Sequence, residues 1–340
     1  MEKIPDFKGL NTSNKIKIVA YGVRKDELEA FHRFANLYNI ELKIIKKGLS
    51  SSTIGESLGY KLISFIGSCN LGKKNLEILK KNGIKFAASR SIGYDNVDLD
   101  AAAKLNIKVS NSSYSPYSVA EFTVMSMMNL LRRLPLAVKK VGINDFSLKG
   151  LKGRELQNQV IGVVGTGKIG RTVIQCLSGF GCKVIAYDPF PSNLDNIEYV
   201  SLEELKKQSD IITLHIPMTG KNKHMIDSKF LSDAKDGVLI INTARGELVH
   251  TEDLVAGLKS GKVGGAALDV LEGENGVIFK DCSRRQIDND NLVILKNMPN
   301  VQITPHQAFF THQAVSDMVE ISLKSLLEFY SAGDAANSLN

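Results

Sequence analysis

The chain has few cysteines and no long hydrophobic run, and both features narrow the class of protein. Its four cysteines, Cys69, Cys176, Cys182 and Cys282, form no CxxC pair and have no metal-type spacing to the six histidines. We therefore expect no bound metal and a reduced, cytoplasmic setting. No uncharged apolar stretch approaches the roughly 18 residues that cross a bilayer, and residues 1–8 contain no apolar signal core, so neither membrane insertion nor secretion is expected.

The charge balance is basic, but the charges are scattered. Lys and Arg number 43 against 36 Asp and Glu, which gives a formal net charge of +7. Because no long basic run occurs, charged solvent faces explain this excess better than nucleic-acid binding, which we do not expect. The 340 residues, 43% of them hydrophobic, suffice for two domains.

Short apolar runs alternate with helical periodicity along the whole chain. This alternation predicts an α/β fold with two doubly wound parallel sheets. In the first part, strands are expected at 15–21, 41–45, 62–66, 84–88 and 107–109, and helices at 26–38, 75–81 and 96–105. After a long helix at 118–134, strands are expected at 159–164, 183–187, 211–215, 238–242, 265–269 and 301–304, and helices at 167–180, 202–208, 228–234, 252–260 and 312–331.

A glycine pattern directly after the strand at 159–164 is the most informative segment. Gly165 permits a tight turn, Gly167 lets the backbone approach a pyrophosphate, and Gly170 lets the helix pack closely on the strand. The phosphates would bind the free N–H groups of the helix N-terminus. The next strand ends in Asp188, where an acid can accept hydrogen bonds from ribose hydroxyls and repel a 2′-phosphate. The pattern predicts NAD rather than NADP.

Three polar side chains follow apolar strands of this second half, at the sheet edge where α/β proteins bind ligands. Arg245 follows the strand at 238–242, and its planar fork suits a carboxylate, although a surface ion pair is an alternative. His306 follows the strand at 301–304 and could act as an acid and base, or be structural. Glu274 could pair with the protonated imidazole, or be an exposed loop acid.

Together these motifs resemble the D-isomer-specific 2-hydroxyacid dehydrogenase family over essentially the whole chain. The matching motifs are GTGKIG at 165–170, NTARG at 242–246, GGAALDV at 264–270 with Glu274, and ITPH at 303–306. Two further stretches, 89–98 and 114–122, resemble the D-lactate dehydrogenase branch of that family.

The resemblance implies a Rossmann cofactor domain, residues 114–309, inserted into a flavodoxin-like substrate domain formed by residues 1–113 and 310–340. The active site would lie in the cleft between them. The resemblance further implies a homodimer that uses NAD and transfers hydride reversibly between NADH and pyruvate, giving D-lactate.

Residue roles follow from the same resemblance. His306 would donate and accept the proton, Glu274 would be its partner, and Arg245 would clamp the substrate carboxylate and carbonyl. Among substrate contacts, the backbone N–H groups of Ile92 and Gly93 would hold the other carboxylate oxygen, and Tyr114 would border the side chain. Among cofactor contacts, Lys168 and Ile169 would meet the pyrophosphate, Asp188 the ribose, Ile216, Pro217 and Asn222 the adenosine, and Thr243, Ala244, Arg245 and Asp269 the nicotinamide.

Three alternatives remain open at this stage. The substrate could be a larger branched or aromatic 2-oxo acid, because one methylene is worth only about 1–3 kcal/mol of discrimination. Tyr114, Phe309 and Phe310 make a small or medium apolar substituent plausible. The fold could instead serve a non-enzymatic NAD-sensing protein, or a Rossmann enzyme that transfers a group other than hydride.

Overall fold

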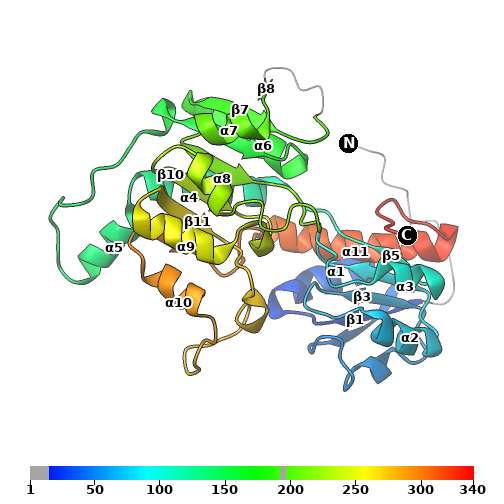
Figure 1. Ribbon diagram of the computed structural model, residues 1–340. Helices are drawn as coiled ribbons and strands as arrows, with labels where there is room; N and C mark the ends of the chain where they lie inside the picture. Colours follow the sequence, from blue (N-terminus) through cyan, green and yellow to red (C-terminus); the bar gives the residue numbers. More distant parts are fainter. Residues whose placement is uncertain (1–14, 192–196) are drawn as a thin grey trace. The chain divides into compact units, whose positions relative to one another are not determined.

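Two parallel β-sheets organise the chain, one in each of two units (Figure 1). The computed structural model describes residues 15–191 and 197–340. Unit 1 comprises Met1–Ser115 and Thr311–Asn340, and unit 2 comprises Pro116–Phe310. Residues 1–8, on which the expectation of no signal peptide rests, lie outside the described residues. In the described ranges, no helix is both long enough and apolar enough to cross a membrane.

Unit 1 contains a five-stranded sheet with the order β2-β1-β3-β4-β5. Every neighbouring pair is parallel, and the chain leaves β1 toward one edge and then continues toward the other, which makes the sheet doubly wound. Its strands are β1 (Ile16–Tyr21), β2 (Ile40–Ile45), β3 (Leu62–Phe65), β4 (Phe86–Ser89) and β5 (Lys108–Ser110). Its helices are η2 (Lys25–Glu27), α1 (Leu28–Leu37), η3 (Ile54–Ser57), α2 (Lys73–Lys81), α3 (Leu99–Lys104) and α11 (His312–Ala332).

The side chains of β1 alternate between the two faces of this sheet. Ile18 and Ala20 pack with α1 and α11, whereas Val19 and Tyr21 pack with α2 and α3. This two-residue period is the strand geometry that places successive side chains on opposite faces. The C-terminal helix α11 therefore belongs to unit 1, where the Phe329 ring stacks on a ring from β4.

Unit 2 contains a seven-stranded parallel sheet with the order β12-β11-β10-β9-β6-β7-β8. The strand order reverses between β6 and β9, and such a switch point is where doubly wound sheets bind nucleotides. Its strands are β6 (Val160–Val164), β7 (Lys183–Tyr187), β8 (Glu198–Tyr199), β9 (Ile211–Leu214), β10 (Val238–Asn242), β11 (Val263–Leu268) and β12 (Val301–Ile303). Its helices are α4 (Tyr117–Leu131), α5 (Leu134–Gly142), η4 (Leu156–Asn158), α6 (Lys168–Leu177), η5 (Ser178–Phe180), α7 (Leu202–Gln208), α8 (Ser228–Asp233), η6 (Gly246–Leu248), α9 (Thr251–Ser260), η7 (Glu274–Gly276) and α10 (Asp290–Asn297).

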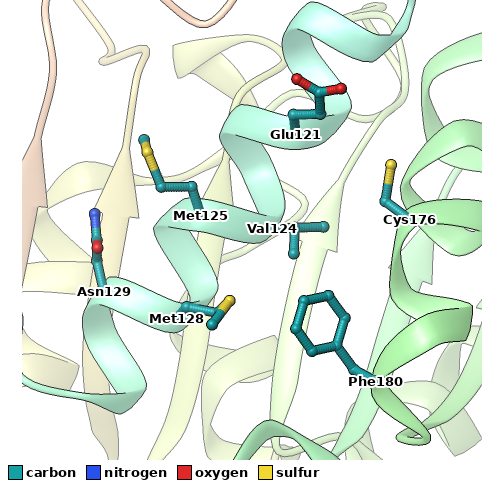
Figure 2. A pocket seen from close by; sticks show the side chains of 7 residues that line it. All are labelled: Glu121, Val124, Met125, Met128, Asn129, Cys176 and Phe180. Atoms are coloured by element: carbon teal, nitrogen blue, oxygen red, sulfur yellow. The ribbon is translucent and has the colours of Figure 1, made fainter.

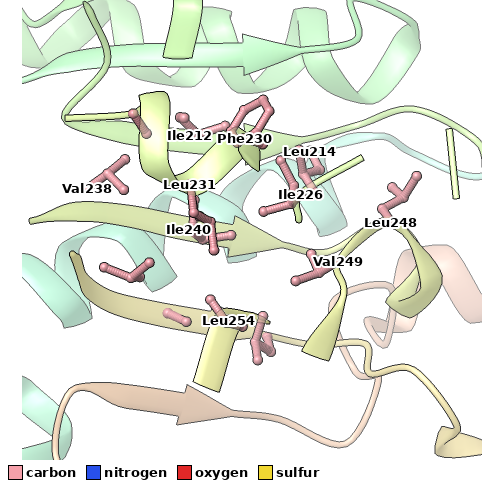
Figure 3. Close-up of a cluster of buried hydrophobic side chains, with 14 of the residues drawn as sticks. Ile212, Leu214, Ile226, Phe230, Leu231, Val238, Ile240, Leu248, Val249 and Leu254 are labelled. Atoms are coloured by element: carbon pink, nitrogen blue, oxygen red, sulfur yellow. The ribbon is translucent and has the colours of Figure 1, made fainter. Parts of the chain in front are cut away.

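Helices cover both faces of this second sheet. On one face, α8 and α9 bury Phe230, Leu231 and Leu254 against Ile240 and its neighbours (Figure 3). On the other face, α4 and α6 pack on the strands in a separate cluster. Because both faces are buried, the strands are almost continuously apolar, as parallel strands usually are.

The predicted fold class, two doubly wound parallel sheets, is confirmed, but several boundaries differ. The long helix expected at 118–134 ends at Leu131, because Arg133 adopts a left-handed backbone and a new helix, α5, begins at Leu134. The helix expected at 96–105 begins only at Leu99, because the Asp98 side chain caps it by accepting a hydrogen bond from the Ala101 N–H group. Elements α5, α10 and β8 were not predicted.

Candidate active site

The glycine turn lies at the switch point of the unit 2 sheet, between β6 and α6. Gly165 has a φ of +95°, and a side chain there would meet the His215 carbonyl oxygen at 2.7 Å. A side chain at Gly170 would overlap the Gly165 carbonyl oxygen. Gly167 has nothing within 4 Å of the position that a Cβ would occupy. Two of the glycines are therefore needed for packing, and Gly167 leaves open space beside the backbone.

The start of α6 presents hydrogen-bond donors beside this open space. Within residues 15–191 and 197–340, no acceptor is bonded to the N–H groups of Gly167, Lys168 and Ile169. Free N–H groups at a helix N-terminus, together with the helix dipole, attract a phosphate. This turn therefore fits the pyrophosphate of a dinucleotide, as the sequence pattern predicts.

Asp188 follows β7 and is tied to the glycine turn. Its Oδ2 accepts hydrogen bonds from the Thr166 N–H group at 2.7 Å and from Thr166 Oγ1 at 3.0 Å, and its Oδ1 accepts one from the Phe190 N–H group. Tyr199 donates in turn to Thr166 Oγ1. Partial burial pushes the pKa of Asp188 upward, but the hydrogen bonds from Thr166 and Phe190 outweigh it and lower the pKa below its usual value. The carboxylate stays charged at neutral pH.

The loop after β9 contains the residues implied to face adenosine. Ile216 lies against the glycine turn, since a side chain at Gly165 would collide with its Cγ2 atom. The Asn222 side chain accepts hydrogen bonds from the Thr219 N–H and hydroxyl groups and donates to the Pro217 carbonyl oxygen at 2.8 Å. Asn222 thus shapes its own loop, and the contacts of Ile216, Pro217 and Asn222 with a cofactor remain predictions.

Arg245 lies in a turn fixed by the residue that ends β10. The buried Asn242 side chain accepts a hydrogen bond from the Ala244 N–H group at 3.0 Å and donates one to the Arg245 carbonyl oxygen at 2.8 Å. Thr243 is held as well: Thr123 donates its proton to a carbonyl oxygen of α4, so the Thr243 hydroxyl must donate to Thr123 Oγ1 at 3.0 Å. The partly buried residues 243–245 thus have a defined backbone.

Glu274 and His306 are in direct contact. The distance from His306 Nδ1 to Glu274 Oε1 is 2.7 Å, and Glu274 Oε2 accepts a hydrogen bond from the Leu271 N–H group at 2.8 Å. The His306 side chain is 32% exposed and that of Glu274 19% exposed. Because Glu274 bonds Nδ1, the other ring nitrogen, Nε2, is the one available to a substrate. The predicted pair is thus present within unit 2.

Asp269 fixes the loop that carries His306. Its carboxylate accepts hydrogen bonds from the Thr304 hydroxyl at 2.6 Å, and from the N–H groups of Gln307 and Ala308 at 2.9 Å each. Asp269 is 3% exposed, so these bonds are shielded from water. They hold His306 in a left-handed backbone conformation, with a φ of +56°. The described hydrogen bonds of the Asp269 carboxylate are with this loop, and its place beside the nicotinamide remains a prediction.

Aromatic rings surround the His306 imidazole. The Phe279 ring centre lies 5.8 Å from that of His306, and the Phe309 ring lies 6.3 Å away in an edge-to-face arrangement. Phe279 and Phe309 also meet edge-to-face, and Phe310 contacts Phe309. Phe279 is 60% exposed and Phe310 51% exposed, which leaves apolar surface beside the titratable ring.

The candidate substrate residues of unit 1 lie in a turn after β4 and a segment after β5. Carbonyl groups of this turn are bonded: the Ser91 hydroxyl donates to the Gly93 carbonyl oxygen, and Asn111 donates to that of Ile92. The N–H groups of Ile92 and Gly93 have no partner in the described part of the chain. Tyr114 is partly buried. The turn could therefore donate two hydrogen bonds to an anion.

Sequence reasoning gave no role to several residues that shape the site. Asn242 could have been noticed, because it is a polar residue at the end of the otherwise apolar strand at 238–242. The sequence contained no signal for Phe279, which lies in a segment without periodicity and reaches His306 through a left-handed backbone. Neither did it reveal that Thr166 and Tyr199 would form a hydrogen-bonded chain to Asp188.

Comparison with known proteins agrees with this geometry. Residues 124–308 match the family model described as D-isomer specific 2-hydroxyacid dehydrogenase, NAD binding domain. The chain is 46% identical over 326 residues to the aromatic 2-oxoacid reductase of Clostridium sporogenes, covering 95% of this chain and 98% of that one. It is 37% identical to the D-lactate dehydrogenase of Lactiplantibacillus plantarum, covering 94% and 98%. The structure of a D-2-hydroxyisocaproate dehydrogenase aligns with a TM-score of 0.88 at 36% identity, covering 95% and 99%.

The chain therefore belongs to the D-isomer-specific 2-hydroxyacid dehydrogenase family, as the motifs predicted. Within that family it is an NAD-dependent D-2-hydroxyacid dehydrogenase whose cofactor is NAD. Among the described residues, no group of His, Cys, Asp and Glu could hold a metal ion.

The charge of Asp188 yields a test of cofactor choice. Asp188→Asn keeps an oxygen that can accept from Thr166 but removes the charge that would repel a 2′-phosphate. We expect the ratio of kcat/KM for NADPH to that for NADH to rise about tenfold in steady-state assays. The control is Asp236→Asn, at a 91% exposed side chain of the same unit. An unchanged ratio would show that Asp188 does not select the cofactor.

Proposed function

We propose that the protein reduces 2-oxo acids that carry a large apolar or aromatic side chain to D-2-hydroxy acids, reversibly. The observation that carries this proposal is the cluster of Phe279, Phe309 and Phe310 beside the His306–Glu274 pair. Aromatic rings in edge-to-face contact stabilise a further ring by about 0.5–1.5 kcal/mol beyond area burial. The similarity to an aromatic 2-oxoacid reductase supports the same substrate class.

In this proposal His306 is the acid and base. When bound, NADH supplies the hydride that reaches the C2 carbonyl carbon of the substrate. His306 Nε2 donates a proton to the C2 oxygen as negative charge develops there, and in oxidation it accepts that proton. Glu274 fixes the ring through Nδ1 at 2.7 Å and stabilises the charged imidazole by Coulombic attraction.

Arg245 would bind the substrate carboxylate and its C2 oxygen. Its guanidinium is always charged and offers a planar pair of N–H donors, which suits bidentate contact with oxygen atoms. The turn that Asn242 fixes sets the direction of its side chain, whose Nη1 donates to the Ala244 carbonyl oxygen at 2.8 Å. In unit 1, the N–H groups of Ile92 and Gly93 would donate to the other carboxylate oxygen, and Tyr114 would border the substituent.

The acid and base role of His306 is tested by His306→Gln. We expect kcat to fall about 10²- to 10⁴-fold, because glutamine cannot transfer the proton, while the Kd for NADH stays the same. Oxidation of NADH is followed by absorbance. Glu274→Gln should lower kcat less, since the histidine remains. His250→Gln, at a partly exposed histidine that pairs with Asp253, is the control. Unchanged turnover in His306→Gln would refute the role.

The substrate class is tested with a panel of phenylpyruvate, 2-oxoisocaproate and pyruvate. We expect phenylpyruvate to have the highest kcat/KM. Phe279→Ala should lower that value about tenfold and leave the value for pyruvate within twofold, since only the large substituent reaches the removed ring. The matched control is Phe190→Ala, at a phenylalanine that is 88% exposed. Equal losses for both substrates would contradict a specificity role for Phe279.

Pyruvate reduction to D-lactate is the second candidate. It is favoured by the similarity to a D-lactate dehydrogenase and by the stretches at 89–98 and 114–122. A higher kcat/KM for pyruvate than for phenylpyruvate would establish it over the first candidate. NADH binding without turnover of any 2-oxo acid would instead favour an NAD-sensing protein. The four free cysteines agree with the reducing cytoplasm that the sequence predicts.

We further infer that unit 2 carries the surface of a homodimer. Along the outer side of α4, Met125, Met128 and Phe180 line a largely apolar hollow of about 430 Å³ (Figure 2). Beyond α4, exposed apolar side chains continue in α5, where Val138 is 63% exposed, and in the segment after it, where Phe146 is 74% and Leu148 83% exposed. Monomeric proteins rarely expose apolar surface of this extent, and a second copy of the chain would bury it.

The dimer is tested by placing charge on this surface. The double substitution Phe146→Asp and Leu148→Asp should produce a species with the mass of one chain, 37.2 kDa, where the wild type has twice that mass. Size-exclusion chromatography with light scattering measures both. Phe190→Asp, at the exposed phenylalanine after β7, should leave the mass unchanged. A wild-type protein with the mass of one chain would refute the inference.

A further inference from the structure

Arg90 is a charged residue that lies wholly inside unit 1. It follows β4 directly, and its side chain has no exposed surface. Its Nε donates to Glu27 Oε1 at 2.9 Å, its Nη1 to Ser64 Oγ at 2.9 Å, and its Nη2 to the Tyr21 carbonyl oxygen at 2.8 Å. The three nitrogens thus contact β1, η2 and β3. The Phe31 ring lies 5.1 Å from the guanidinium carbon.

Stability alone is a poor explanation for this buried ion pair. Removing two charges from water is costly, and replacing such a pair by apolar side chains is often neutral or stabilising. Lysine would not substitute, because a single ammonium cannot form three bonds in the plane of a guanidinium. The geometry therefore points to a requirement for position, and the segment that Arg90 positions is the turn that follows it.

We propose that Arg90 is a positioning residue for the carboxylate-binding turn of residues 91–93, an inference that rests on the proposed function of that turn. The Arg90 N–H group donates to the Phe65 carbonyl oxygen at 2.7 Å, and the hydrogen bond from the guanidinium to Glu27 fixes the side chain of the same residue. Arg90 is therefore held at both its backbone and its side chain. These bonds fix the backbone direction at Arg90, the residue directly before the turn of residues 91–93.

A second set of hydrogen bonds holds the carbonyl oxygens on either side of Arg90 and in the turn that follows it. The Ser112 hydroxyl donates to the Ser89 carbonyl oxygen, and the Ser112 N–H group donates to that of Ser91. With the carbonyl oxygens of Ile92 and Gly93 also bonded, the acceptors of the turn are engaged within unit 1. The N–H groups of Ser91, Ile92 and Gly93 have no partner in the described ranges of the chain. Arg90 thus supports a turn whose donors stay available.

The decisive variant removes both buried charges together, Glu27→Gln with Arg90→Met, so that no unpaired charge is left in the core. Each variant is studied as the full chain with NADH bound. We expect the KM for the preferred 2-oxo acid and the Kd for oxamate, a non-reducible carboxylate probe, to rise about tenfold or more. The kcat should change less than threefold, because the carboxylate is bound equally well in the ground state and in the transition state. The Kd for NADH should also change less than threefold. Arg90→Lys, which keeps the charge, should give an intermediate KM.

A matched control separates positioning from general destabilisation. Lys206→Met with Asp233→Asn removes another ion pair, 2.9 Å long, whose lysine side chain is 5% exposed in unit 2. It should lower Tm and leave the Kd for oxamate unchanged. An oxamate Kd in the Arg90 variant equal to that of the wild type would overturn the inference, and so would a wild type that does not bind oxamate. A wild type that binds oxamate but reduces no 2-oxo acid overturns only the proposed function.

Discussion

The candidate site of unit 2 depends on the carboxylate of Asp269, which is buried at the end of β11. Three hydrogen bonds from Thr304, Gln307 and Ala308 converge on it, and together they hold the loop after β12. A buried carboxylate without these donors would cost several kcal/mol, so the loop and the acid require one another. Their mutual requirement keeps His306 at a φ of +56°, a conformation that is unfavourable for this residue in isolation. The contact between His306 and Glu274 follows from that constraint.

The two turns that would bind anions are likewise fixed by hydrogen bonds with neighbouring side chains. In the turn of residues 165–169, Asp188 accepts the hydrogen bond of the Thr166 N–H group, and the N–H groups of Gly167, Lys168 and Ile169 have no acceptor among the described residues. In the turn of residues 91–93, serine and asparagine side chains donate to carbonyl oxygens, and the N–H groups have no acceptor in the part of the chain that the structure describes. Each turn therefore presents partial positive charge on a rigid backbone, which costs no reorganisation when an anion binds.

The parts of the structure that sequence could predict are those with local causes. Strand and helix periodicity gave the two parallel sheets, and Gly165, Gly167 and Gly170 gave the dinucleotide turn, because each depends on a few consecutive residues. The pairing of His306 with Glu274 was suggested by their common position after strands and by the family resemblance. Asn242 acts locally in the Arg245 turn, because it bonds backbone groups two and three residues after it. Asp269, in contrast, bonds residues of the His306 loop that lie 35 to 39 positions away in the sequence. No spacing in the sequence encodes those contacts.

Substrate preference is the property that is hardest to predict from sequence motifs, and the physical basis of substrate recognition explains why. The fixed part of a 2-oxo acid is its carboxylate and carbonyl, which charged and backbone donors recognise with large energies. The variable part is an apolar substituent, whose recognition depends on area and ring geometry at about 1–3 kcal/mol per feature. In the function proposed above, that difference would rest on Phe279 and Phe309, whose rings meet edge-to-face, with Phe279 in a left-handed backbone conformation. Reaction class is therefore readable from motifs, whereas the proposed preference would depend on how one irregular loop folds beside His306.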